Sequence, residues 1–122
     1  MEHPDISLCH EKIVSFLRNL EDKNINGAYR ELLKGSIVER KKEEVELLKK
    51  SPTIAFDTYG AALGHDCISE SCYGQILAKL LYVMKFEHYP ITWEFMYYRA
   101  HTTWKLISMR FSDQFDLRTS NG

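Results

Sequence analysis

The chain has neither an excess of one charge nor a long apolar run. Its 16 lysines and arginines nearly balance its 17 aspartates and glutamates, which leaves a net charge of −1. That balance excludes a general electrostatic attraction to nucleic acid or to acidic membranes. The longest apolar stretch, at 76–86, contains two lysines and is too short to span a bilayer. We therefore expect neither nucleic acid nor a membrane as a partner.

Cysteine is scarce as well. The three cysteines, Cys9, Cys67 and Cys72, are an odd number, so at least one is unpaired within the chain. This favours a reducing compartment over a disulfide scaffold. The start, MEHPDISLCHEK, lacks the basic and apolar regions of a signal peptide. We expect a cytoplasmic protein.

No catalytic or nucleotide-binding signature is present in the sequence. Hydrophobic residues make up 44% and charged residues 27% of the 122 positions, which is an ordinary globular balance. A chain of this length suits one domain with one core. We expect a single domain over 1–117, followed by a polar tail at 118–122.

The spacing of apolar residues in the first half is helical. Apolar side chains recur at three and four residues over 9–20, which predicts a first helix. A shorter pattern over 28–33, with Gly35 as a C-cap, predicts a second helix. A third stripe over 45–59 continues through Pro52 and indicates one long helix, kinked at the proline.

After Gly64 the hydrophobic period changes to two, and four strands are expected, at 65–72, 75–87, 91–99 and 103–113. The links between them are short, and short links permit only antiparallel neighbours. The sequence therefore predicts an α+β fold, in which N-terminal helices pack on a curved four-stranded antiparallel sheet.

Alternation along the strands assigns each side chain to one face of the sheet. The helix-facing set predicted in this way contains Tyr82, Met84, Trp93, Phe95, Tyr97, Ile107, Met109 and Phe111. The opposite face is more apolar than a solvated face usually is. Its candidates for a dimer interface are Leu81, Met96, Tyr98, Trp104 and Leu106, with Arg110 at the rim. Since such a patch usually marks an interface, we expect a homodimer through the sheet.

Three segments carry a resemblance to a known group: YGAALGHD at 59–66, LLYVMKFEHYPITWEFMYYR at 80–99 and TWKLISMRFSDQF at 103–115. They resemble the nuclear-transport-factor-2-like superfamily, also called the cystatin-like cone, and within it uncharacterised bacterial members. The resemblance covers the last half of the chain well and the helical half loosely. It implies a cone with a pocket between the long helix and the concave face of the sheet, and dimerisation through the sheet. The superfamily contains isomerases, dehydratases, small-molecule binders and non-catalytic dimerising modules, so the fold alone does not select a function.

The pocket that the resemblance implies would be lined by residues of the helix-facing set. The candidates are Tyr82, Met84, Trp93, Phe95, Tyr97 and Met109, together with Tyr59 from the long helix. Such a lining suits a small apolar ligand, although ordinary core packing requires the same residue types. We expect a non-enzymatic dimerising module that binds a small apolar ligand and uses no cofactor.

The alternative is a cofactor-free isomerase or lyase that acts on a small hydrophobic substrate. The resemblance implies an acidic base inside the cone for this chemistry, and Asp57 and Asp66 are the acids to consider. Tyr82 or Tyr97 would then polarise the substrate. This alternative requires one of the carboxylates to reach the interior, because a general base must lie within hydrogen-bonding reach of its proton.

Metal-ligating residue types are present but poorly spaced. His65, Cys67 and Cys72 form H-x-C-x4-C, which lacks the paired C-x2-C half of a zinc site, and the pair Cys9-His10 lies far away in sequence. Strand alternation places Cys67 and Cys72 on opposite faces, which also disfavours a disulfide between them. We expect no metal site.

Overall fold

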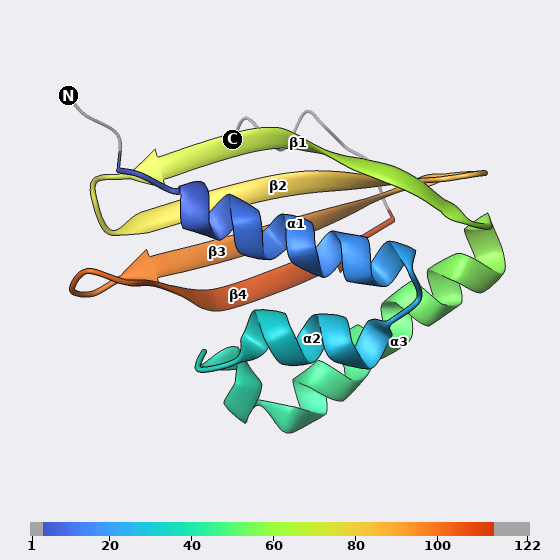
Figure 1. Cartoon of the computed structure of the whole chain (residues 1–122), viewed down its shortest axis with the longest axis horizontal. Coiled ribbons are helices and arrows are strands. Elements are labelled where there is room, and N and C mark those ends of the chain that lie inside the picture. Colours follow the sequence, from blue (N-terminus) through green and yellow to red (C-terminus); the bar gives the residue numbers. More distant parts are fainter. Residues whose placement is uncertain (1–3, 114–122) are drawn as a thin grey trace.

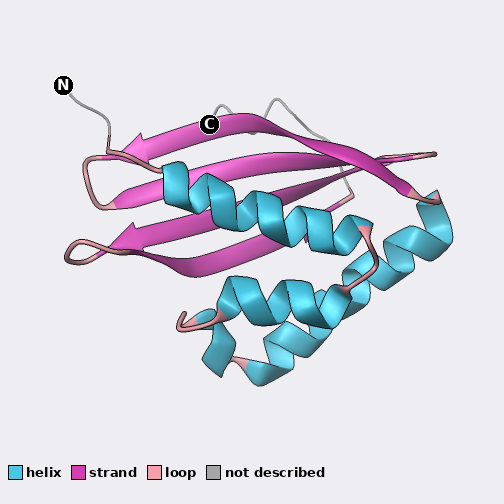
Figure 2. Ribbon diagram, in the orientation of Figure 1, coloured by secondary structure: helices cyan, strands magenta, loops and turns pink. Residues whose placement is uncertain are grey.

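The computed structural model describes residues 4–113. Helices precede strands along this part of the chain, which confirms the predicted α+β arrangement (Figure 2). The elements are α1 (Ser7–Glu21), α2 (Ile25–Leu33), the 3-10 helix η1 (Val38–Arg40), α3 (Lys42–Tyr59), β1 (Ala62–Tyr73), β2 (Leu77–Phe86), β3 (Pro90–Arg99) and β4 (Trp104–Ser112). None of the helices in this described part is long and apolar enough to cross a membrane. The expected polar tail at 118–122 lies outside the described residues.

The four strands form one open antiparallel sheet in the order β1-β2-β3-β4. The predicted meander is thus confirmed, and β1 begins at Ala62, three residues before the predicted start at 65. In Figure 1, α1 crosses the sheet, α2 lies on its β4 side, and α3 runs from that side to the start of β1. The residues under α1 are the predicted helix-facing set of β2 and β3, which alternates with less buried neighbours along both strands.

The helix that crosses the middle of the sheet is α1, while the apolar stripe of the long helix α3 packs against the margin of the same core. Five residues of α1 are almost completely buried: Cys9, Ile13, Phe16, Leu17 and Leu20. The Phe16 ring lies 5.4 Å from the Trp93 ring and 5.9 Å from the Phe95 ring, centroid to centroid. In α3 only Pro52 and Ala55 are buried. Its ring contacts with the sheet are made near its C-terminal end, on Phe86.

The predicted continuity of α3 through Pro52 is confirmed. The helix ends at Gly60, whose φ of 89° is a conformation that side chains other than glycine rarely adopt. A Cβ atom at this position would lie 3.1 Å from the Cβ of Glu87. The Glu87 carboxylate also accepts a hydrogen bond from the Ala61 backbone N–H at 3.1 Å, so the end of α3 is joined to the end of β2.

A β-bulge in β4 corrects the predicted faces of that strand. Met96 pairs with Ser108 and Tyr97 pairs with Leu106, which leaves Ile107 as an extra residue. Because one extra residue reverses the alternation, Trp104 and Leu106 lie on the helix side together with Met109. Trp104 is only 6% exposed, and its indole Nε1 donates a hydrogen bond to the Asp5 carbonyl at 3.0 Å. The predicted assignment of Trp104 and Leu106 to the outer face was therefore wrong. Arg110, by contrast, is exposed as predicted.

A second bulge, in β1, corrects the faces of the two strand cysteines. Cys67 pairs with Tyr82 and Ser69 pairs with Leu81, so Ile68 is the extra residue. Beyond the bulge, Cys72 pairs with Ala78, which belongs to the helix-facing set of β2. Cys67 and Cys72 consequently share the helix-facing side, and the prediction of opposite faces was wrong.

We expect Phe16→Ala to lower the free energy of unfolding by about 3–5 kcal/mol, because it leaves a cavity at the place where α1 meets the sheet. Besides Trp93 and Phe95, the Phe16 ring contacts the Tyr29 ring of α2, with 5.0 Å between the centroids. The cavity would therefore adjoin both the sheet and α2. Urea-induced unfolding, followed by circular dichroism, measures the change.

Leu8→Ala on the same helix is the matched control. Leu8 is 46% exposed, and its truncation should change stability by less than about 0.5 kcal/mol. If the two variants lose the same free energy of unfolding, the buried face of α1 does not form the centre of the core.

Candidate functional site

The residues predicted to line one pocket are distributed among several places. Tyr82 and Tyr97 are buried on the helix side, which confirms their predicted orientation. Met84, Trp93 and Phe95 are at most 1% exposed and belong to the packed core. Met109 lines a shallow hollow between α3 and β4. Tyr59 donates a hydrogen bond to the Asp113 carboxylate at 2.9 Å and stacks on Tyr89.

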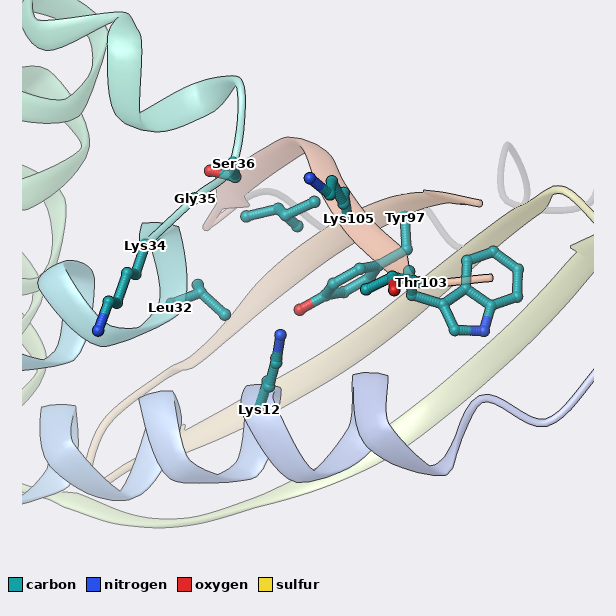
Figure 3. A pocket seen from close by; sticks show the side chains of 10 residues that line it. Lys12, Leu32, Lys34, Gly35, Ser36, Tyr97, Thr103 and Lys105 are labelled. Atoms are coloured by element: carbon teal, nitrogen blue, oxygen red, sulfur yellow. The ribbon is translucent and has the colours of Figure 1, made fainter. Parts of the chain in front are cut away.

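Tyr97 borders a pocket that the sequence did not indicate. This pocket lies between α1, the end of α2 and the adjoining ends of β3 and β4, and has a volume of about 220 Å³ (Figure 3). We call it the lysine pocket, after three of its lining residues. It is lined by Lys12, Leu32, Lys34, Gly35, Ser36, Tyr97, Thr103, Trp104, Lys105 and Leu106. Trp104 and Leu106 reach it only because the bulge at Ile107 turns them to the helix side.

The Tyr97 hydroxyl is the polar atom at the inner end of this pocket. The residue is 1% exposed, and its hydroxyl has no hydrogen-bond partner among residues 4–113. Figure 3 shows the hydroxyl pointing toward the ammonium group of Lys12. Burial raises the pKa of this hydroxyl above its ordinary value, so the group is a neutral donor at physiological pH. A buried hydroxyl without a partner destabilises the free protein, which makes this position an exception to the usual satisfaction of buried polar groups.

The three lysines bring positive charge to the pocket from three elements. Lys12 extends from α1, Lys34 follows α2 and Lys105 lies in β4. In Figure 3 the ammonium group of Lys12 lies beside the Tyr97 hydroxyl, whereas that of Lys34 is turned outward at the rim. Lys105 pairs with Tyr98, so its side chain is directed toward the outer face of the sheet and it borders the pocket only at its edge. Within the described residues, none of the three forms an ion pair. The nearby Glu39 carboxylate accepts a hydrogen bond from the Gly35 backbone N–H instead.

A second group of polar side chains lies on the other flank of α1, where that helix meets β1. His10 contacts the Tyr82 hydroxyl through Nδ1 and the Glu70 carboxylate through Nε2. The Tyr82 hydroxyl also interacts with the Cys67 thiol. We call His10, Cys67, Glu70 and Tyr82 the histidine cluster.

Burial differs within the histidine cluster. Tyr82 is 3% exposed, and its burial raises its pKa to about 12. Cys67 as a residue is exposed, but its thiol is partly desolvated, and this desolvation raises the pKa of the thiol. A thiol with a raised pKa is a weak nucleophile in the free protein.

The other residues considered for a metal have different partners, although the His65 ring lies 6.4 Å from the Tyr82 ring. The imidazole Nδ1 of His65 lies 2.7 Å from a carboxylate oxygen of Glu21. Cys72 is half-buried against the core. Cys9 is buried, and desolvation raises its pKa to about 12.

The acids considered for an enzyme do not reach the interior. Asp57 is an exposed residue of α3. Asp66 is exposed and pairs with Val83, which places it on the outer face of the sheet. Neither carboxylate is positioned to act on a ligand between helices and sheet.

Sequence reasoning missed both sites for a physical reason. Lys12 and His10 lie next to buried positions of α1, and the helical pattern alone treats such residues as solvated. Glu70 shares a face with Cys67 only because of the bulge at Ile68. A one-residue bulge leaves no clear mark in the sequence, so no available signal indicated either grouping.

Comparisons with models of protein families, with curated proteins and with solved structures gave no match.

We expect Tyr97→Phe to raise the free energy of unfolding by about 1 kcal/mol at neutral pH, because it removes a buried hydroxyl that has no partner. The difference should widen above pH 10. There the unfolded chain loses its tyrosine proton while folded Tyr97 retains it, so the wild type loses about 1.4 kcal/mol of stability per pH unit from this group. Urea unfolding at pH 7 and pH 11 measures both effects.

Tyr98→Phe is the matched control on the same strand. Tyr98 is 40% exposed and points to the opposite face, so its substitution should change stability little at either pH. A loss of stability in Tyr97→Phe, rather than a gain, would indicate that the hydroxyl is hydrogen-bonded in solution.

Proposed function

We propose that this chain is a non-enzymatic binding module of the nuclear-transport-factor-2-like type, and that it holds a small apolar ligand carrying one anionic group in the lysine pocket. The observation that carries this proposal is the buried Tyr97 hydroxyl beside Lys12, since neither the hydroxyl has a hydrogen-bond partner nor the lysine an ion pair within residues 4–113. An anionic oxygen in the pocket would accept hydrogen bonds from the hydroxyl and from an ammonium group together. The polar atom that destabilises the free protein would then stabilise the complex.

The size and walls of the pocket support a compact ligand. Its volume of about 220 Å³ exceeds the roughly 150 Å³ of an engineered cavity that holds benzene. Leu32, Trp104 and Leu106 supply apolar surface, and the Lys12 ammonium group lies beside the Tyr97 hydroxyl. This arrangement suits a ring or short chain that ends in a carboxylate, in keeping with the usual pattern of apolar walls and few polar groups.

A binding role fits this pocket better than catalysis. The described residues that line it include no carboxylate and no imidazole, so it lacks the general base that the isomerase or lyase alternative needs. Hydrogen bonds to charged groups contribute about 1.5–3 kcal/mol each, enough to hold the anionic end of a ligand in a half-enclosed site.

We expect benzoate and hexanoate to bind at least tenfold more tightly than the neutral benzamide and hexanamide, since the neutral compounds forgo the charge-assisted bonds, each worth more than about 1.4 kcal/mol. Lys12→Gln and Tyr97→Phe should each weaken benzoate binding by about tenfold or more. Isothermal titration calorimetry measures these constants.

Lys85→Gln serves as the control, because Lys85 is exposed on the other face of the sheet and its loss changes the net charge equally. Equal affinity of the anionic and neutral compounds, or an equal loss of affinity in Lys85→Gln, would contradict the proposed site.

We propose further that the module forms a homodimer through the open face of its sheet. The apolar residues of this face, which we call the outer patch, are Leu77, Leu81, Val83, Met96 and Tyr98. No helix covers this face within residues 4–113. Its charges are of both signs, with Glu94 directly opposite Arg110 and Lys79 opposite Met96. A face of mixed charge can match itself across a twofold axis, which favours a second copy as the occupant.

Met96→Glu should convert the dimer into a monomer, because it places a carboxylate inside the proposed interface. In the monomer the new carboxylate lies opposite Lys79, so the fold itself should be preserved. Sedimentation velocity measures the association state. Leu47→Glu on α3, where Leu47 is 63% exposed, is the control that should leave it unchanged. If Met96→Glu is still a dimer, the interface lies elsewhere. If the wild type is a monomer, the proposal of a homodimer is wrong.

We also propose a cytoplasmic location. The three cysteines are free thiols in the fold, and Cys67 is exposed. Exposed free thiols persist most readily in a reducing compartment. This agrees with the expectation drawn from the odd number of cysteines.

A further inference from the structure

The histidine cluster gathers three different metal-ligating side chains at one place. An imidazole nitrogen of His10, the Cys67 sulfur and a Glu70 carboxylate oxygen all lie within 4.8 Å of one another. They come from two elements, α1 and β1, that are far apart in the sequence. The proposed binding role uses none of them, since the lysine pocket lies on the other flank of α1.

The bulge in β1 is what places two of these groups together. Residues 67 and 70 are three apart, and regular alternation would send their side chains to opposite faces. With Ile68 as the extra residue, Cys67 pairs with Tyr82 and Glu70 pairs with Leu80, two members of the helix-facing set of β2. Both side chains therefore lie on the side where α1 presents His10.

The hydrogen bonds of His10 show which nitrogen faces the acidic group. Its Nε2 contacts the Glu70 carboxylate, while Nδ1 contacts the buried Tyr82 hydroxyl. A ligating histidine usually makes a hydrogen bond through its other nitrogen, and that bond orients the ring. Tyr82 is in position to serve this purpose, and its hydroxyl also interacts with the Cys67 thiol.

We propose that His10 Nε2, Cys67 Sγ and a Glu70 carboxylate oxygen bind one Zn²⁺ ion at the junction of α1 and β1. Nitrogen, sulfur and carboxylate oxygen are the donor atoms that zinc takes in proteins, and three protein ligands leave a fourth position for water. Cys67 and Glu70 are exposed, so this fourth position faces solvent.

The geometry requires only small side-chain movements. In a tetrahedral zinc site the ligand atoms lie about 3.4–3.6 Å apart, a value that follows from zinc–ligand bonds of about 2.0–2.3 Å. A His10 imidazole nitrogen, the Cys67 sulfur and a Glu70 oxygen are already within 4.8 Å of one another, and Nε2 is the nitrogen in contact with Glu70. The Glu70 side chain is 51% exposed and free to withdraw from His10, which makes room for the ion between them.

The proton balance of binding follows from the same contacts. The Cys67 thiol loses its proton to solvent as the zinc–sulfur bond forms. In the free protein the Nε2–H of a neutral His10 donates to the Glu70 carboxylate, and Nδ1 accepts from the Tyr82 hydroxyl. On binding, Nε2 gives its proton to solvent and ligates the metal, while Nδ1 takes a proton from solvent and donates to the Tyr82 oxygen, so the ring has no net gain or loss of protons. One proton is released per Zn²⁺ when His10 starts neutral.

The test uses the full chain, freed of metal by a chelator and kept reduced, and titrated with Co²⁺ and with Zn²⁺. Cobalt bound by a thiolate gives a sulfur-to-metal charge-transfer band in the near ultraviolet, and tetrahedral cobalt gives intense visible bands. Zinc affinity is measured by competition with a chromophoric chelator. Cys67→Ser, His10→Gln and Glu70→Gln each remove one ligand. Cys72→Ser is the matched control, because Cys72 lies on the same strand and the same face.

We expect one equivalent of metal and a charge-transfer band in the wild type and in Cys72→Ser, with no band in Cys67→Ser. Loss of an outer partner alone costs about 10–100-fold in metal affinity, so we expect each ligand variant to bind Zn²⁺ at least about 100-fold more weakly. Circular dichroism of each variant confirms that it is folded. A wild type that takes up no metal, a band that disappears in Cys72→Ser instead, or an unchanged zinc affinity in Cys67→Ser would overturn the proposal.

Discussion

The contacts of the Phe16 ring with Trp93 and Phe95 hold α1 across the middle of the sheet, and both candidate sites depend on that placement. Residues two apart on a helix point about 200° away from each other. Lys12 accordingly reaches the lysine pocket on one flank of α1, while His10 reaches β1 on the other. A shift of α1 along or across the sheet would separate both from their partners. The apolar contacts of Phe16 thus position Lys12 and His10, the polar residues of α1 that belong to the two candidate sites.

Two one-residue bulges complete these sites. Ile107 turns Trp104 and Leu106 inward, where they form one wall of the lysine pocket. Ile68 brings Cys67 and Glu70 to one face beside His10. Bulges bend strands and re-aim side chains, and they occur often beside functional sites. Their positions here, each next to a candidate site, are consistent with a sheet shaped for binding as well as for stability.

Two buried polar atoms differ in their surroundings, one in the packed core and one beside a pocket. Trp93 Nε1 and the Tyr97 hydroxyl are the two buried side-chain polar atoms without a partner in the described part of the chain. Trp93 lies in the aromatic core, where its ring stacks on Phe95 and contacts Phe111. Tyr97 instead borders a pocket with charged walls. Only the Tyr97 hydroxyl borders a pocket, so burial and cavity together, rather than burial alone, make it the candidate for ligand binding.

The sequence by itself determined the class of fold and most of its elements, because hydrophobic period is a local property. A period near 3.6 before Gly60 and a period of two after it yielded the helices, the strands, and the inward faces of β2 and β3. Tertiary structure decided which helix covers the sheet, since α1 and α3 both carry apolar stripes and only packing chooses between them. It also decided the inward faces of β4 and of the end of β1. A single extra residue reverses alternation, and its location depends on how neighbouring strands pair rather than on the local pattern. The grouping of Lys12 with Tyr97 and Trp104, and of His10 with Cys67 and Glu70, follows from those tertiary choices alone.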